Sequence, residues 1–238
     1  YPVTVEAYCT DGMPMFELVG LPDAAVKESR ERVRAALSAC QMTFPVARLT
    51  LNLAPADVRK EGPAYDLPIA LAILASTGVI DGESMQGVAA VGELSLSGSV
   101  MGVRGALSMA IAAREHGLHT IMLPAQNAAE AACIEGLSVL PVAHLSDAIN
   151  HLRGKKAIEP LHTRPYAQIL GERKTGCDFA DVRGQKGAKR ALEIAAAGGH
   201  NVLMIGPPGS GKTMMARCLP GILPDMTLEE ALEVTRIH

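Results

Sequence analysis

The sequence predicts an α/β protein with two domains, and three observations support this fold class. Strand-like and helix-like segments alternate up to about residue 152, which is the pattern of helices layered on a sheet. Hydrophobic residues make up 48% of the chain but aromatic residues only 3%, so the core must consist mainly of Ala, Leu, Val, Ile and Met. A glycine-rich loop at 206–213 follows a short apolar segment, which indicates a second domain that begins near residue 178.

The first domain is expected to open with two short strands, Tyr1–Tyr8 and Met15–Val19, around a turn at Asp11 and Gly12. Asp23 then has the position of an N-cap for a helix that runs through Cys40. Hydrophobic residues recur along one face of this helix at Val26, Val33 and Leu37. Its solvent-facing set is expected to contain Arg30, Arg32 and Arg34.

The remainder of the first domain continues the alternation. Arg48–Leu53 alternates polar and apolar residues, as a half-buried strand does. Asp66 is expected to be the N-cap of a buried helix that runs through Thr77. The later elements are expected as a strand over Val88–Leu96, a helix over Gly105–His116, a strand over Thr120–Leu123, a helix over Asn127–Ile134, a strand over Ser138–Val142 and a helix over Ser146–Leu152.

Residues 153–177 are expected to form a linker between the domains 1–152 and 178–238. The segment is rich in Pro and Gly, and a solvated flexible connector is the favoured interpretation. The alternative is a basic strip that contacts nucleic acid or a neighbouring subunit. Its six basic residues are Arg153, Lys155, Lys156, Arg164, Arg173 and Lys174.

Charge and hydropathy restrict the classes of partner. The formal net charge is −3, which argues against a grip of the whole chain on nucleic acid. A local basic patch of Arg30, Arg32, Arg34, Arg48, Arg59 and Lys60 is conceivable, but a charged helix face balanced by glutamates is favoured. The longest apolar run, Leu67–Ile80, is too short to span a bilayer. We therefore expect no membrane partner and a cytoplasmic location.

Cysteine and histidine do not indicate a metal site. The five cysteines are far apart and include no Cys-x-x-Cys pair, so reduced thiols in a cytoplasmic protein are expected rather than disulfides or zinc ligands. The seven histidines lack ligand spacing and are expected to be ordinary polar or capping residues.

The strongest motif is the stretch Gly206-Pro207-Pro208-Gly209-Ser210-Gly211-Lys212-Thr213, which matches G-x-x-x-x-G-K-[ST] in full. The glycines let the backbone turn and approach a phosphate closely, so that N–H groups form an anion nest. The Lys212 ammonium would bind the β- and γ-phosphates, and the Thr213 hydroxyl would bind Mg²⁺. The motif predicts ATP and Mg²⁺ as ligands.

The segments around the loop agree with this interpretation. Asn201–Ile205 has the length and apolarity of a buried parallel strand, and the following helix, expected over Lys212–Leu219, would point its N-terminus at the phosphates. A further helix is expected over Gln185–Ala197. Asp178–Gln185, followed by Lys189–Asn201, resembles the opening of an AAA+ module in the magnesium-chelatase branch. That resemblance implies that the Val182–Gln185 stretch lies beside the adenine, with Val182, Arg183 and Gly184 as the candidate residues, although Asp181 and Gly184 also suit an ordinary helix start.

The first domain resembles the N-terminal domain of the Mg-chelatase-like AAA+ ATPases of the ComM/YifB group. The matching stretches are Phe16–Asp23 with Val26–Arg30, then Asn52–Asp57, then Gly62–Pro68. This domain is in turn similar to the proteolytic domain of Lon, so the resemblance implies a Lon-protease-like, ribosomal protein S5-like α+β fold.

The resemblance to Lon does not extend to its Ser–Lys dyad. Glu61-Gly62-Pro63-Ala64 corresponds to the motif that carries the nucleophilic serine, which places Ala64 at the nucleophile position. The register of Val91–Val100 places Leu107 where the lysine should be. Neither side chain supplies a nucleophile or a base, so proteolysis is not expected. A relocated dyad would have to use Lys60 with Ser95, Ser97 or Ser99.

The family resemblance implies a ring-forming, hexameric ATPase that drives DNA branch migration during integration of transforming DNA. The alternatives are a magnesium-chelatase subunit that powers metal insertion, a proteolytic machine and a partner-binding module. The chain starts at Tyr1 without Met, so we expect its true start to be missing. We also expect 1–238 to be the front portion of a longer protein. The acidic strand motif, the sensor and the arginine finger are expected beyond His238, because the acidic cluster near Asp225 does not follow an apolar strand. We therefore predict no catalytic residue within 1–238 and no ATP turnover by this portion alone.

Overall fold

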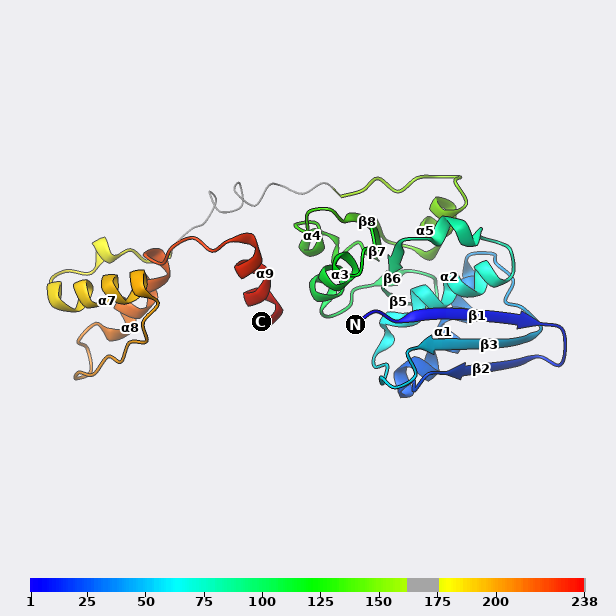
Figure 1. The fold of residues 1–238 in the computed structure, drawn as a ribbon, viewed down its shortest axis with the longest axis horizontal. Coiled ribbons are helices and arrows are strands. Elements are labelled where there is room, and N and C mark those ends of the chain that lie inside the picture. The colour runs from blue at the N-terminus through cyan, green and yellow to red at the C-terminus, as the bar shows by residue number, and fades with distance from the viewer. Residues whose placement is uncertain (162–175, 238) are drawn as a thin grey trace. The chain divides into compact units, whose positions relative to one another are not determined.

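The computed structural model describes residues 1–161 and 176–237 and divides the chain into two compact units, 1–163 and 164–238 (Figure 1). Most of the predicted linker, residues 162–175, lies outside the described part. Within the described ranges, no helix is long and apolar enough to cross a membrane.

The first unit begins with a three-stranded mixed sheet (Figure 1). Its strands are β1 (Thr4–Thr10), β2 (Met15–Val19) and β3 (Arg48–Ala54), in the order β1-β3-β2. β3 runs antiparallel to β1 and parallel to β2. The two strands predicted around the Asp11-Gly12 turn are formed, but they do not pair with each other. The chain does reverse there, but β3 occupies the place between the two strands.

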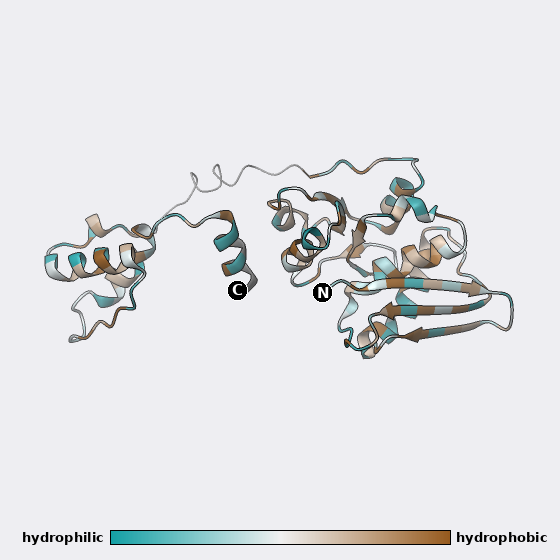
Figure 2. Cartoon of the chain, in the orientation of Figure 1, coloured by the Kyte–Doolittle hydropathy of each residue, from teal (hydrophilic) through white to brown (hydrophobic). Residues whose placement is uncertain are grey.

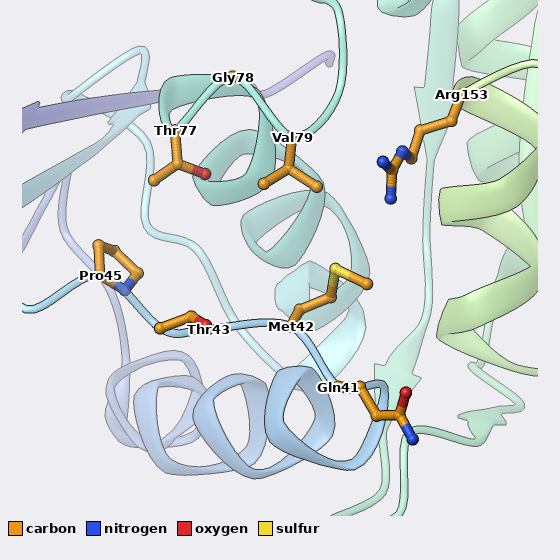
Figure 3. A pocket seen from close by; sticks show the side chains of 8 residues that line it. All are labelled: Gln41, Met42, Thr43, Pro45, Thr77, Gly78, Val79 and Arg153. Atoms are coloured by element: carbon orange, nitrogen blue, oxygen red, sulfur yellow. The ribbon is translucent and has the colours of Figure 1, made fainter.

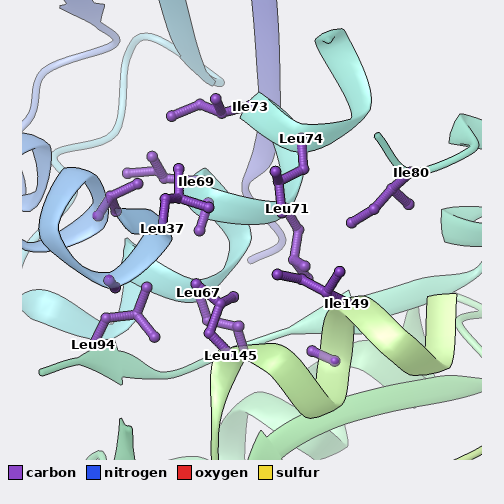
Figure 4. Packing of buried hydrophobic residues seen from close by; sticks show 14 of the residues in the cluster. Leu37, Leu67, Ile69, Leu71, Ile73, Leu74, Ile80, Leu94, Leu145 and Ile149 are labelled. Carbon is purple, nitrogen blue, oxygen red and sulfur yellow. The ribbon is translucent and has the colours of Figure 1, made fainter. Parts of the chain in front are cut away.

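Two helices cover this sheet and form the core of the unit. α1 (Ala24–Ala39) begins as predicted at Asp23, whose carboxylate accepts the N–H of Val26 at 2.8 Å. α2 (Asp66–Ser76) packs against β1 and α1 and is buried on nearly all sides because almost all of its residues are apolar. Figure 4 shows the resulting cluster, in which α2 side chains meet Leu37 of α1 and Leu145 and Ile149 of α5 (Leu145–Leu152).

Two sequence-based assignments in these helices need correction. Asp66 is the first residue of α2 rather than its N-cap, which is Tyr65 at the end of the short 3₁₀ helix η1 (Pro63–Tyr65). Arg32 does not face solvent, since it forms an ion pair with the buried Asp66 carboxylate. Burial of that carboxylate requires a partner, and Arg32 lies within reach on α1.

A second, parallel sheet consists of β4 (Val88–Ala90), β7 (Thr120–Pro124) and β8 (Ser138–Val142) in the order β4-β7-β8. The strand predicted over Val88–Leu96 is broken into β4 and β5 (Glu93–Leu94), and β5 pairs with β6 (Val100–Met101). The break occurs because the N–H of Gly92 leaves the sheet and donates to the Ala64 carbonyl at 2.9 Å.

The remaining helices of this unit are η2 (Gly82–Met85), α3 (Ala106–Glu115), α4 (Ala128–Ala131) and α5 (Leu145–Leu152). α3 and α5 agree with the prediction to within a residue at either end. α4 is much shorter than the predicted Asn127–Ile134, because the chain turns after Ala131 and buries Ile134 instead. His144 confirms its expected capping role, since its ring accepts the N–H of Ser146 at the start of α5.

The second unit is helical in the residues described. It comprises η3 (Phe179–Asp181), α7 (Lys186–Gly198), α8 (Lys212–Cys218), η4 (Leu219–Gly221) and α9 (Leu228–Ile237). α7 and α8 agree with the prediction to within about a residue. The small core of this unit consists of Val182, Leu192, Met215 and Cys218.

The strand predicted over Asn201–Ile205 is not formed. The segment is irregular, and Leu203 and Ile205 are 84% and 87% exposed; its hydrophobic residues are brown in Figure 2. A strand needs a neighbour to receive its N–H and C=O groups, and the described part of this unit offers no second strand.

Candidate nucleotide site

The loop Gly206–Thr213 lies between the irregular segment and α8. Gly209 and Gly211 have φ angles of +79° and +85°, a region that side chains with a Cβ rarely adopt. A Cβ on Gly206 would lie 3.1 Å from the Ser210 hydroxyl oxygen. The glycines of the motif therefore stand where the backbone turns sharply, as the sequence predicts.

The Lys212 ammonium lies inside this loop. Its Nζ donates to the carbonyl oxygens of Gly206 and Pro207, both at 2.8 Å, and to the Ser210 hydroxyl at 3.2 Å. The side chain is half-buried although it begins a helix at the surface. The loop thus places a positive charge at its centre, surrounded by neutral acceptors. Thr213, the predicted Mg²⁺ ligand, follows in the first turn of α8 and is exposed.

A pocket of about 360 Å³ adjoins the loop. Its walls come from α7, the irregular segment and the loop, and they include Gln185, Leu192, Ile205, Ser210 and Lys212. Gln185 also reaches the loop directly, with its Nε2 3.5 Å from the Ser210 carbonyl oxygen. The pocket lining therefore combines apolar side chains with the Lys212 side chain and the polar residues Gln185 and Ser210.

Of the Val182–Gln185 stretch predicted beside the adenine, the residues 182–184 do not line this pocket. Val182 is buried in the core of the unit, 6% exposed, and Arg183 and Gly184 are exposed. The adjacent Gln185 does line the pocket. The adenine role of 182–184 thus stays a prediction, and Gln185 is the residue of this stretch nearest to the phosphate loop.

Neither of the two positions predicted to correspond to the Lon dyad carries a catalytic side chain. Ala64 lies in η1, where its carbonyl accepts the Gly92 N–H. Leu107 lies in α3 and is 6% exposed, packed as an ordinary core residue. A methyl and an isobutyl group at these positions offer no nucleophile and no base.

The relocated dyad considered from the sequence is not assembled. Lys60 is fully buried, and its ammonium donates to the carbonyl of Pro55 rather than to a serine. The candidate serines instead bond to one another, with Ser95 Oγ 2.9 Å from Ser97 Oγ and 3.0 Å from the Ser99 N–H that it accepts. The Ser97 carbonyl accepts the His144 Nε2–H at 2.9 Å.

The conceivable basic patch is largely neutralised by carboxylates. Arg30 pairs with Glu31, Arg48 with Glu17 and Arg59 with Glu61. Arg32 is engaged by Asp66, and Lys60 is buried. On α1 itself, Arg30 pairs with Glu31 and Arg32 lies 3.7 Å from Glu28, which confirms the helix face balanced by glutamates. The pairs of Arg48 and Arg59 lie outside that helix.

Sequence reasoning missed the polar cluster around Asp66. Its carboxylate accepts Arg32 Nε at 2.6 Å, Arg32 NH2 at 3.0 Å and the Leu94 N–H at 3.1 Å, and so joins α1, α2 and β5. Burial raises the pKa of the Asp66 carboxyl, while the Arg32 guanidinium and the Leu94 N–H act in the opposite direction. The available signal was a single charge at the start of an otherwise apolar helix.

A further pocket of about 560 Å³ lies in the first unit where α1, α2 and α5 end (Figure 3). Met42, Pro45 and Val79 form its apolar wall, and the side chain of Arg153 extends toward it. Among the residues named as site candidates, Arg153 of the alternative basic strip lines this pocket.

Two family models match the chain. The model described as "Subunit ChlI of Mg-chelatase" matches residues 5–127, and the one described as "Magnesium chelatase, subunit ChlI" matches residues 178–238. The second match begins at Asp178, where the sequence resembles the opening of an AAA+ module.

Curated relatives align along nearly the whole chain. It is 45% identical over 236 residues to YifB of Salmonella typhimurium and 42% identical over 237 residues to the competence protein ComM of Haemophilus influenzae. Each alignment covers 99% of this chain and 46% of the relative, so the chain spans about half the length of these relatives. A Lon protease of Mycolicibacterium smegmatis is 26% identical over 170 residues, which cover 66% of this chain and 21% of that protease.

Proposed function

The chain belongs to the Mg-chelatase ChlI family, in its YifB and ComM branch, and from this premise we propose that Gly206–Thr213 binds the triphosphate of MgATP. The family is one of AAA+-type ATPases. The observation that carries the proposal is the Lys212 ammonium, which a glycine-rich turn holds against the Gly206 and Pro207 carbonyls beside a pocket.

The acceptors that now surround Lys212 explain how the loop would take up a phosphate. Two neutral carbonyls and one hydroxyl receive its donors. Phosphate oxygens are charged acceptors, and charge-assisted hydrogen bonds are the stronger kind. We therefore propose that Lys212 exchanges its loop acceptors for the β- and γ-phosphates, while loop N–H groups bind the remaining oxygens.

The residues present also suit the metal that accompanies ATP. The Thr213 hydroxyl, in the first turn of α8, would be the protein's ligand to Mg²⁺, an ion that prefers oxygen ligands. The metal would neutralise charge on the bridged phosphates. We assign no residue of 1–238 to hydrolysis, because the acidic cluster in α9 includes Glu230, which forms a capping pair with Thr227.

Binding is tested by titrating MgATP into the chain in a calorimeter, and comparing Lys212→Ala with the wild type. The proposal expects saturable binding that Lys212→Ala weakens at least tenfold. Lys155→Ala, which removes an exposed lysine of the first unit, is the matched control and should bind as the wild type does. Equal affinity for the wild type and Lys212→Ala would refute the assignment.

We further propose that the full-length protein forms a hexameric ring and drives branch migration of DNA. The name of the Haemophilus influenzae relative, competence protein ComM, supports a role in uptake or integration of DNA. The formal net charge of −3 and the paired arginines of the first unit argue against an extended DNA surface here, so we assign no DNA contact to that patch.

The DNA proposal is tested on the full-length protein by its ATPase rate with and without single-stranded or branched DNA. Stimulation that disappears in Lys212→Ala would support a DNA motor. An unchanged rate with every DNA form would favour the alternative of a metal-insertion ATPase, which the two Mg-chelatase matches keep in view. Repeating the assay with a porphyrin and Mg²⁺ separates the two.

A further inference from the structure

Two cysteines of the second unit lie in direct contact. Cys177 Sγ and Cys218 Sγ are 2.7 Å apart although 41 positions separate them in the chain, and both are free thiols. A disulfide bond is about 2.05 Å long, so the sulfurs need to approach by only about 0.65 Å. No other two cysteine sulfurs in the described part of the chain lie within hydrogen-bonding distance of each other.

The elements that carry the two thiols hold them in place. Cys218 is the last residue of α8, fully buried, and its Sγ also donates to the Asp178 carbonyl at 3.3 Å. Cys177 is half-buried and precedes η3, whose start is fixed by a reciprocal capping pair between Asp178 and Asp181. Both thiols pack against the same small core. The contact therefore joins two anchored segments.

The surroundings do not suit a metal. Among the described residues, no group of three or more His, Cys, Asp or Glu side chains is arranged to hold an ion. A two-sulfur site in an apolar core lacks the four ligands that zinc requires. Two thiols in contact can instead form a disulfide when an oxidant accepts their two electrons.

We propose that Cys177 and Cys218 form a reversible intramolecular disulfide when the protein meets a peroxide. The half-buried Cys177 reacts first: its thiolate attacks the peroxide, the O–O bond breaks, and a sulfenic acid forms with release of water. Cys218 Sγ then attacks the Cys177 sulfur, the S–O bond breaks and a second water leaves. Two thiols are oxidised by two electrons, and one hydrogen peroxide is reduced to two waters.

The order of these steps follows from accessibility. Burial raises the pKa of the Cys218 thiol to about 11, and its neighbours Cys177, Asp178 and Asp181 add to the effect. The thiolate is the reactive form, so Cys218 is a poor first target for an oxidant. Its position against Cys177 makes it the partner that resolves the sulfenic acid.

The proposed bond would close a loop that contains α7 and the whole phosphate loop. It would tie the beginning of the second unit to the end of the helix that starts at Lys212. This inference stands independently of nucleotide binding, because it rests on the contact between the two sulfurs alone.

The test treats the full chain with a small excess of hydrogen peroxide, blocks the remaining thiols by alkylation, and maps tryptic peptides by mass spectrometry. Cleavage after Arg183 and Arg217 places the two cysteines on separate peptides. The expected result is a linked pair that is lighter by two hydrogens and that dithiothreitol separates. Thiol titration should fall from five per chain to three, since the chain has five cysteines and the bond uses two.

Two variants make the result specific. Cys177→Ser should retain all four of its thiols under the same treatment, whereas Cys133→Ser, the matched control outside the pair, should still lose two. Circular dichroism confirms that both variants are folded, and the peptide map of the wild type stands without them. The proposal is overturned if Cys177 and Cys218 both remain open to alkylation, or if either links preferentially to Cys9, Cys40 or Cys133.

Discussion

At the scale of single residues, two aspartates at helix starts organise the first unit in different ways. Asp23 is a cap: it accepts the Val26 N–H at 2.8 Å and the Gly62 N–H at 3.1 Å, and so ties the start of α1 to the segment before η1. Asp66 is instead a buried charge that binds Arg32 and the Leu94 N–H. An aspartate at the start of a helix thus has two different roles in this unit, and the degree of burial of its carboxylate distinguishes them.

The Asp23 cap leads to a prediction about stability and pH. Burial acts to raise the pKa of Asp23, but the N–H groups of Val26 and Gly62 and the charge of Arg59 outweigh it and lower the pKa below its usual value. Asp23→Ala should reduce the free energy of unfolding by about 1–2 kcal/mol at pH 7. Asp23→Asn, which retains an acceptor for Val26, should lose less.

The charge-dependent part of this stabilisation follows the lowered pKa. It is complete above the unfolded pKa of about 3.9 and disappears as the pH falls through the lower folded value. The difference between wild type and Asp23→Asn in urea unfolding should therefore shrink from pH 6 to pH 3. A difference that stays constant or grows toward acid pH would contradict this account.

Ala64 permits a test of the degenerate protease site. Ala64→Ser restores a hydroxyl at the nucleophile position, but Leu107 supplies no base and the buried Lys60 ammonium is engaged by Pro55. We expect no hydrolysis of a fluorogenic peptide above the wild-type background. Hydrolysis that persists after repurification and is lost on reaction with a serine-directed reagent would show that another group activates the serine.

At the scale of elements, the sequence predicted best where a local pattern determines the structure. The alternation in Arg48–Leu53 gave β3 with its alternate residues buried, and the capping signal at Asp23 gave the start of α1. The candidate phosphate loop could be proposed from the sequence because its glycines and Lys212 form a contiguous motif, and phosphate binding there stays a prediction. In each of these cases, the residues that fix the geometry are neighbours in the chain.

The predictions failed where the partner is distant in sequence. The Asp11-Gly12 turn indicates a reversal but not that β3 will pair with both flanking strands. The ion pair of Arg32 with Asp66 spans 34 positions. Val202–Ile205 is apolar enough for a buried strand, but strand formation depends on a neighbour that its own residues cannot specify.

Gly20 shows how closely β2 is held against β3, and this closeness can be tested. A Cβ at Gly20 would lie 2.1 Å from the Leu53 carbonyl oxygen, whereas a Cβ at Gly12 would meet nothing within 4 Å. Both glycines have positive φ angles. Gly20→Ala should therefore destabilise by about 3 kcal/mol and Gly12→Ala by about 1 kcal/mol in chemical unfolding. Equal losses would mean that the backbone of β3 can retreat.

At the scale of the whole molecule, the two units differ greatly in the size of their cores. Among the residues that the structure describes, the first unit has a cluster of 21 buried residues and the second a cluster of four. Stability depends on the apolar area removed from water, so the second unit should unfold at the lower temperature. Its exposed Leu203 and Ile205 contribute little to that unit as it stands.

Because the two units should unfold at different temperatures, differential scanning calorimetry can show which unit binds the nucleotide. A ligand that binds the native form alone stabilises it by about 2.7 kcal/mol at one hundred times its dissociation constant. MgATP should therefore raise the lower of two transitions and leave the upper one in place, and Lys212→Ala should abolish the shift. A shift of the upper transition would place the binding site in the first unit.

The strand order β1-β3-β2 has a consequence for a chain that emerges from the ribosome. β1 and β2 leave the exit tunnel in succession, with only a short turn between them. They can form backbone hydrogen bonds with each other before β3 has been translated. A β1–β2 pair would use the backbone groups to which β3 must bond. The two strands therefore have to separate once residue 54 has left the tunnel. Delayed pairing of this kind slows folding, because the partners of β3 in β1 are distant in sequence.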